Sequence, residues 1–129
     1  MSGLAATSFL ALIEDLRLNQ QRSPWAKVQG VDGWTDQLSK EVAEVREAVQ
    51  EASADDLHLG EEMGDVLWTW IAAAIVLEER GGPSMDAIIV NAQAKLRRRK
   101  PWVFDKTATL PSTPEEENKI YLEMKRVAQ

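Results

Sequence analysis

Two pairs of acidic residues have the types and spacing that could do chemistry. Glu41 with Glu44, and Glu62 with Asp65, are each spaced three apart inside an apolar, helix-like stretch. Residues three apart on a helix point the same way within roughly 60°. If two such helices pack antiparallel, four carboxylates face one another, and their repulsion calls for a cation or shared protons. Carboxylate oxygens favour Mg²⁺ or Mn²⁺, which indicates phosphate chemistry.

Five helices and no convincing strand are predicted to position these acids. Apolar spacing and end signals place them at about residues 5–20, 35–52, 53–80, 84–100 and 113–128. Residues 21–34, with Pro24, Gly30 and Gly33, are expected to form a loop. Long helices joined by short loops favour an all-α antiparallel bundle. We expect one domain over residues 1–129, with a bundle core at about 5–104 and a C-terminal helix at about 113–128.

The predicted helix ends and core stripes come from individual residues. Ser53, three residues before Asp56, resembles a capping box, and Gly81-Gly82-Pro83 is a stop signal. Thr113 before Pro114 is a helix start. The predicted core stripe of the second helix is Leu38, Val42, Val45 and Val49. That of the third is Thr69, Ala72, Ala73 and Val76, which Glu62 and Asp65 continue toward the N-terminus.

Composition excludes several classes of protein. The 129 residues include no cysteine, which rules out disulfides, zinc–thiolate sites and thiol catalysis. The net charge of −6 argues against nucleic acid as the main partner. The N-terminus lacks the pattern of a secretory signal, and the longest apolar run, Val66 to Leu77, is too short to span a membrane. We expect a cytoplasmic protein with no membrane partner.

Each candidate group has an alternative interpretation. Acids three apart on a helix are commonly solvated surface residues. A di-iron site would need Glu-x-x-His, and the only histidine, His58, does not follow a glutamate at that spacing; we expect it in the turn between helices, in solvent. Trp25 lies in a polar loop, where it could stack on a nucleobase or close the end of the bundle.

A basic run near the end of the fourth helix suits phosphate. Lys95, Arg98 and Arg99 repeat at three and four residues and so share a helical face. Guanidinium groups match phosphate oxygens. The alternative is a solvated basic helix end that complements the helix dipole.

Four ordered segments make the chain resemble the MazG family of all-α nucleoside triphosphate pyrophosphohydrolases. The family's Glu-Glu-x-x-Glu block corresponds to Lys40-Glu41-Val42-Ala43-Glu44, and its Glu-x-x-Asp block to Glu62-Met63-Gly64-Asp65. Its Pro-Trp-x-Lys segment is matched by Pro24-Trp25-Ala26-Lys27. Its Lys-Leu-x-Arg-Arg-x-Pro-x-Val-Phe segment is matched by Lys95-Leu96-Arg97-Arg98-Arg99-Lys100-Pro101-Trp102-Val103-Phe104.

The resemblance implies a function and a role for each matched position. Family members assemble at least as dimers and cleave a nucleoside triphosphate between the α and β phosphates, releasing the monophosphate and pyrophosphate in nucleotide-pool house-cleaning. By position, the magnesium ligands and catalytic residues are Glu41, Glu44, Glu62 and Asp65. The substrate-binding residues are Lys27, Lys95, Arg98 and Arg99 for the phosphates and Trp25 for the base. The base and sugar preference, and a homodimer against a homotetramer, stay open.

One functional position departs from the family pattern. The first glutamate of the family block is Lys40 here. An inward-pointing ammonium could take over part of the role of the cation. The alternative function is therefore a catalytically weakened nucleotide-binding or partner-binding bundle, and a purely structural helical oligomer is a third possibility.

Overall fold

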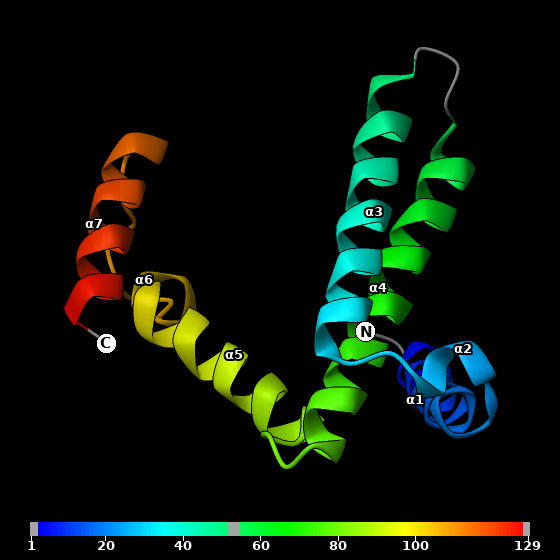
Figure 1. Cartoon of the computed structure of the whole chain (residues 1–129). Coiled ribbons are helices and arrows are strands. Elements are labelled where there is room, and N and C mark those ends of the chain that lie inside the picture. Colours follow the sequence, from blue (N-terminus) through cyan, green and yellow to red (C-terminus); the bar gives the residue numbers. More distant parts are fainter. Residues whose placement is uncertain (1–2, 52–54, 128–129) are drawn as a thin grey trace. The chain divides into compact units, whose positions relative to one another are not determined.

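The computed structural model describes residues 3–51 and 55–127, and every regular element among them is a helix (Figure 1). The predicted all-α fold is confirmed. The chain divides into two compact units, Met1–Ser84 and Met85–Gln129, which are described separately below. The first unit contains α1 (Gly3–Arg22), α2 (Pro24–Lys27), α3 (Val31–Gln50) and α4 (Asp56–Glu79). The second contains α5 (Met85–Arg99), α6 (Pro101–Phe104) and α7 (Pro114–Val127).

The two short helices, α2 and α6, were not expected. Each begins with proline at its first helical position, where the missing N–H costs nothing. In α2, Ser23 caps the turn, and its hydroxyl accepts the Ala26 N–H at 3.2 Å. The loop predicted for residues 21–34 therefore contains a turn of helix.

Helix α3 begins at Val31, so the start predicted near residue 35 is wrong. Gly33, expected in a loop, lies in the first turn of the helix. Glycine in a helix costs about 1 kcal/mol relative to alanine. Burial of Trp34, which is only 1% exposed, outweighs that cost because an indole removes a large apolar surface from water.

Both described ends of α4 are fixed by local hydrogen bonds. Ser53, the predicted cap, lies outside the described residues; the carboxylate of Asp55 caps the helix and accepts the His58 N–H at 2.7 Å. At the other end, Gly81 has a φ of 89° and the Gly82 N–H donates to the Leu77 carbonyl at 2.9 Å. This is a Schellman ending, and the predicted stop at Gly81-Gly82-Pro83 is confirmed.

Helices α3 and α4 lie side by side as an antiparallel hairpin (Figure 1). The predicted core stripe of α3 is wrong in part, because Val42 and Val49 are 48% and 64% exposed. The side chains of α3 that are buried or half-buried at steps of four and three are Trp34, Leu38, Glu41, Val45 and Ala48. On α4 the corresponding row is Glu62, Asp65, Thr69, Ala72 and Val76. We call these two rows, together with the exposed Glu44 that lies one turn from Glu41, the α3–α4 seam. Within the rows, Glu41, Glu62 and Asp65 occupy positions that a helix pair normally fills with apolar residues.

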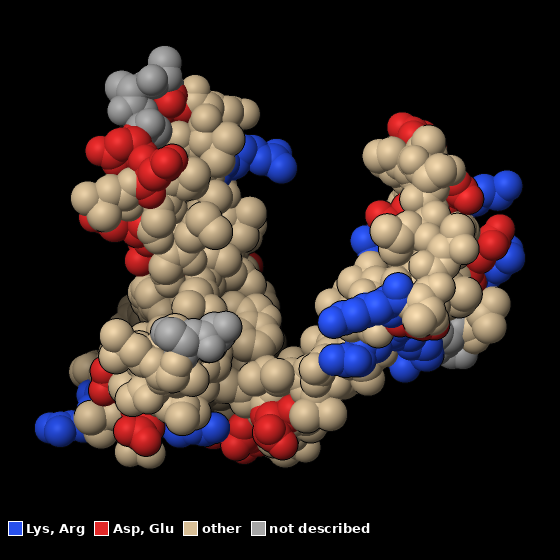
Figure 2. All heavy atoms as spheres, turned by 180° about the vertical axis from the view of Figure 1, so that it is seen from behind, with Lys and Arg blue, Asp and Glu red and all other residues tan. Residues whose placement is uncertain are grey.

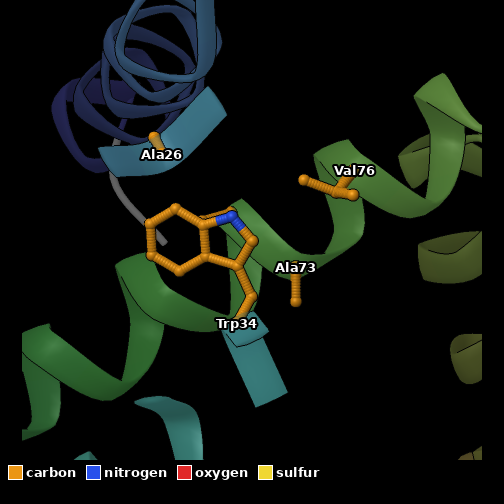
Figure 3. Close-up of a cluster of buried hydrophobic side chains, with 5 residues drawn as sticks. Ala26, Trp34, Ala73 and Val76 are labelled. Carbon is orange, nitrogen blue, oxygen red and sulfur yellow. The ribbon is translucent and has the colours of Figure 1, made fainter. Parts of the chain in front are cut away.

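The apolar core lies where α1 and α2 meet α3 and α4. Residues Ile71 to Val76 of α4 are all buried, whereas Leu67, nearer the start of the helix, is 41% exposed. Figure 3 shows the Trp34 indole between Ala26 of α2 and the Ala73 and Val76 side chains of α4. The core therefore holds α2 against the start of α3.

In the second unit, α7 packs against α5 and α6 through polar contacts. The Glu117 carboxylate accepts the Trp102 indole N–H at 2.9 Å and lies 3.6 Å from the Lys100 ammonium. Thr113 caps α7, as predicted, and its hydroxyl accepts the Glu116 N–H at 3.1 Å. Several apolar side chains of α5 are exposed, including Ile89 at 44%.

No helix in the described part of the chain combines the length and the apolar character that crossing a lipid bilayer requires.

Candidate functional site

Four carboxylates converge in the α3–α4 seam. Glu41 and Glu44 come from α3, and Glu62 and Asp65 from the antiparallel α4. Each offers an oxygen, and these four oxygens all lie within 4.8 Å of one another. The spacing of three within each pair brings both members to one side of their helix, and the antiparallel packing brings the pairs together. The structure thus assembles all four acids that the sequence singled out.

Two of these carboxylates are held in surroundings that disfavour their charge. Among the described residues, Glu41 Oε2 and Glu62 Oε2 are buried and have no hydrogen-bond partner. Burial raises the pKa of Glu41 above its usual 4.5, and the nearby carboxyl of Glu44 and the charges of Asp65 and Glu62 raise it further. Burial likewise raises the pKa of Glu62, with Glu44 as the next cause. Buried acceptors without donors are rare in proteins and call for an explanation.

The donor set fits a hard divalent cation. Four carboxylates offer only oxygen, and the chain contains no cysteine that would favour softer metals. A cation bound between them would satisfy the two buried oxygens and cancel the repulsion that raises both pKa values. The residues that could hold it are Glu41, Glu44, Glu62 and Asp65.

Two neighbours of the acids were missed from the sequence. His58, expected in the inter-helix turn, lies in the first turn of α4, and its Nε2 is 3.9 Å from Glu62 Oε1. The positive form of this imidazole would lower the pKa of Glu62, against the larger effect of burial. Trp68 is half-buried and donates its indole N–H to Asp65 Oδ1 at 3.2 Å. Spacings of four and three along α4 were the signals that could have found them.

Trp25 stands at the end of a row of three indoles. Its ring meets Trp34 edge-on at 5.1 Å between centroids, and Trp34 meets Trp68 edge-on at 6.0 Å. Trp25 is 47% exposed, so part of its ring remains open to solvent. The buried amide of Gln20 fixes the centre of the row, because it accepts the Trp34 indole N–H at 3.2 Å and donates to the Ala26 carbonyl at 2.9 Å.

The expected phosphate-binding residues lie on α2 and on α5. Lys27 is exposed on α2 in the first unit. Lys95 and Arg98 are exposed and Arg99 is half-buried at the end of α5 in the second unit, where Arg99 donates to the Tyr121 hydroxyl at 3.5 Å. On the face seen in Figure 2, acidic side chains gather toward the tip of the α3–α4 hairpin, and a group of basic side chains lies over the second unit.

Lys40, which replaces a family glutamate, does not point inward. Its side chain is exposed, and within the described ranges it makes no ion pair with any carboxylate. The Lys40 ammonium therefore does not neutralise the four acids of the seam. The observation that would favour a catalytically weakened bundle, an ammonium pointing toward these acids, is not made.

Comparison with known proteins places the chain in a family. Residues 29–104 match the MazG nucleotide pyrophosphohydrolase domain. The chain is 33% identical over 98 residues to the uncharacterized protein YabN of Bacillus subtilis, covering 76% of this chain and 19% of YabN. It is 31% identical over 103 residues to the nucleoside triphosphate pyrophosphohydrolase/pyrophosphatase MazG of Thermotoga maritima, covering 80% of this chain and 39% of that protein. The chain therefore spans about a fifth and about two fifths of these relatives.

A solved structure shares the fold. The crystal structure of a MazG-related protein from Thermotoga maritima superimposes with a TM-score of 0.76 at 29% sequence identity, over 90% of this chain and 97% of that one. The domain match includes α3 and α4 and therefore all four carboxylates of the seam, and it supports a function of the nucleotide pyrophosphohydrolase kind. This chain belongs to the MazG nucleotide pyrophosphohydrolase domain family.

Proposed function

We propose that the protein is a magnesium-dependent nucleoside triphosphate pyrophosphohydrolase. In this reaction a nucleoside triphosphate is hydrolysed between its α and β phosphates to the monophosphate and pyrophosphate. The observation that carries the proposal is the convergence of four carboxylate oxygens within 4.8 Å, two of the acids having raised pKa values, in a member of this family. The corresponding role is removal of unwanted nucleotides from the cytoplasmic pool.

The seam acids would bind the cation and accept the proton of the attacking water. Mg²⁺, or Mn²⁺ in its place, would supply charge stabilisation for the phosphates and lower the pKa of water. Glu41, Glu44, Glu62 and Asp65 would hold it, and one of these carboxylates would accept the proton of the attacking water. The chain has no cysteine, and we assign no covalent nucleophile.

Basic and aromatic residues would bind the rest of the substrate. Lys27, Lys95, Arg98 and Arg99 offer ammonium and guanidinium donors to phosphate oxygens, and such contacts stabilise the charge that develops on departing pyrophosphate. The half-exposed ring of Trp25 is suited to stack on the base, since its contact with Trp34 holds it in place while 47% of the residue stays open to solvent.

Pyrophosphate release from a panel of canonical and modified nucleoside triphosphates with Mg²⁺ tests the proposal. We expect turnover of at least one substrate, with the monophosphate and pyrophosphate formed in equal amounts. The Glu41→Gln/Glu62→Gln variant should be inactive, and Glu14→Gln, an exposed acid on α1, serves as the matched control. Wild-type turnover no greater than that of the double variant would reject the proposal.

We further propose that the protein assembles with a second copy of itself, as a homodimer or homotetramer. Apolar residues remain uncovered on the α3–α4 hairpin, where Val42 is 48% and Met63 is 58% exposed. With Val45 and Val66 these residues line a groove of about 220 Å³. An exposed apolar face of this kind is a surface that an interface between two copies would bury.

The oligomeric state is tested by light scattering after size-exclusion chromatography. We expect a mass at least twice 14.4 kDa for the wild type and a smaller mass for Met63→Glu, because a charge buried at an apolar interface is costly. Lys40→Glu, an exposed change on α3 away from the groove residues, is the control. A monomeric wild type would contradict this part of the proposal.

A further inference from the structure

Within the described residues, one acid of the seam differs from the others in accepting a hydrogen bond from a protein donor. Asp65 Oδ1 accepts the Trp68 indole N–H at 3.2 Å, whereas Glu41 Oε2 and Glu62 Oε2 are buried without any partner in the described part of the chain. The distance from the Trp68 indole nitrogen to Asp65 Oδ1 lies within the ordinary range for N–H···O hydrogen bonds. A donor on one oxygen restricts rotation of the carboxylate, and it leaves Oδ2 free of that donor.

The donor is itself held in place from two other helices. The Trp68 ring meets Trp34 of α3 edge-on, with rings 81° apart. Trp34 is buried and is fixed in turn by its hydrogen bond to Gln20 of α1. Because three helices determine where the indole N–H lies, its position is set before any ligand arrives, as preorganised sites require.

We propose that Trp68 is a positioning residue of the cation site. Its N–H orients the Asp65 carboxylate so that it shares a divalent cation with Glu41, Glu44 and Glu62. The inference rests on the proposed function, because it concerns the cation that the proposed reaction uses. Partners that orient metal ligands in this way are commonly worth about 10–100-fold in metal affinity.

A packing role alone would have different consequences. If Trp68 only filled space, Trp68→Phe would keep most of the edge contact with Trp34 and would leave cation binding unchanged. Trp70 provides the matched control, since it is a half-buried indole on the same helix. It lies about 140° round the helix from Asp65, whereas Trp68 lies only about 60° away.

Calorimetric titration of the full chain with Mg²⁺ measures the affinity directly. We expect Trp68→Phe to bind Mg²⁺ about 10–100-fold more weakly than the wild type and Trp70→Phe to bind within about twofold of it. Equal affinities for the wild type and Trp68→Phe would overturn the inference while leaving the proposed function intact. A wild type that takes up no Mg²⁺ would instead overturn both.

The indole N–H signals of the ¹⁵N-labelled wild type give a second readout that does not depend on a variant folding. The signals of Trp68 and Trp70 are assigned through the backbone of the wild type. As Mg²⁺ is added, the Trp68 signal should shift along the calorimetric binding curve and the Trp70 signal should stay in place. A Trp68 signal that does not move at saturation would overturn the inference even if Trp68→Phe proved unstable.

Discussion

Two acids at turns of the second unit, Asp105 and Glu116, and the acids of the α3–α4 seam meet opposite surroundings. Glu116 accepts hydrogen bonds from the hydroxyl and the N–H of Ser112, and these donors hold its pKa below the usual 4.5. Asp105 accepts the hydroxyl of Thr107 at 2.7 Å and its N–H at 3.0 Å, which likewise lower the pKa of its carboxyl. These acids are satisfied by the chain itself.

In the seam the chain leaves two of its acids, Glu41 and Glu62, with an unsatisfied buried oxygen. The pKa values of Glu41 and Glu62 are raised first by burial and then by Glu44, and each has a buried oxygen without a donor among the described residues. The same fold thus supplies donors where an acid caps a turn, and supplies none to the buried oxygens of Glu41 and Glu62, where four acids converge. This difference distinguishes acids that stabilise local structure from acids that await a ligand.

The largest expected effect comes from removing one seam acid. Glu41→Gln should weaken Mg²⁺ binding and pyrophosphate release by more than about 100-fold, because a direct ligand should be worth more than an orienting partner. Glu116→Gln should leave Mg²⁺ affinity and the rate of pyrophosphate release within about twofold of the wild type, because it changes a surface residue far from the seam in sequence. Calorimetry and the pyrophosphate assay measure the two quantities. Similar losses in both variants would remove the distinction between the two groups of acids.

The next effect is the response of stability to the cation. Mg²⁺ at about 100 times its dissociation constant should stabilise the folded protein by about 2.7 kcal/mol, because it binds only where the four carboxylates converge. For a chain of this length that corresponds to a rise in Tm of roughly 10 °C. Differential scanning calorimetry with Mg²⁺ and with a chelator measures the shift. The Glu41→Gln/Glu62→Gln variant should show none, and an equal rise there would place the cation elsewhere.

Local spacing predicted the site better than it predicted the packing around it. Acid pairs three apart already determine that Glu41 with Glu44, and Glu62 with Asp65, share helical faces. The seam of α3 was mispredicted because apolar residues were assumed to be buried, so Val42 took the place that Glu41 occupies. Which face of α3 is buried depends on the register with α4, and a single helix does not encode that register.

Some of the features missed from the sequence could have been predicted from local signals, and others could not. Pro24 and Pro101 are recognisable helix starts, so α2 and α6 could have been predicted from local signals. The three-residue step from Asp65 to Trp68 also indicated a contact. The bond from Trp34 to Gln20 joins residues 14 apart on different helices and follows only from the tertiary packing of α1 against the start of α3.

A smaller effect is expected when pH changes without a cation. The folded pKa values of Glu41 and Glu62 lie above the usual 4.5, so the folded state binds more protons than the unfolded state between those values. The metal-free protein should therefore lose stability as pH rises through and above 4.5, the reverse of the ordinary effect of a salt-bridged acid. Lowered pKa values at Asp105 and Glu116 act in the opposite direction, with stability lost as pH falls.

Comparing the wild type with Glu41→Gln/Glu62→Gln separates these opposing contributions. Urea unfolding at a series of pH values measures the free energy of unfolding of both proteins. As pH rises above 4.5, this free energy should increase for the double variant relative to the metal-free wild type. Added Mg²⁺ should restore the stability of the wild type. A difference that stays constant with pH would mean that these two acids do not titrate abnormally.

The smallest effect should come from the cap of α7. Thr113 accepts the Glu116 N–H at 3.1 Å, and its replacement by alanine should cost about 1 kcal/mol of helix stability. Hydrogen exchange of the α7 amides should then accelerate by about fivefold. Mg²⁺ affinity should not change, because this cap supports an acid that the chain already satisfies. A loss of Mg²⁺ affinity together with faster exchange would mean that the α7 acids and the seam acids are energetically coupled. The two groups of acids could then not be treated as independent.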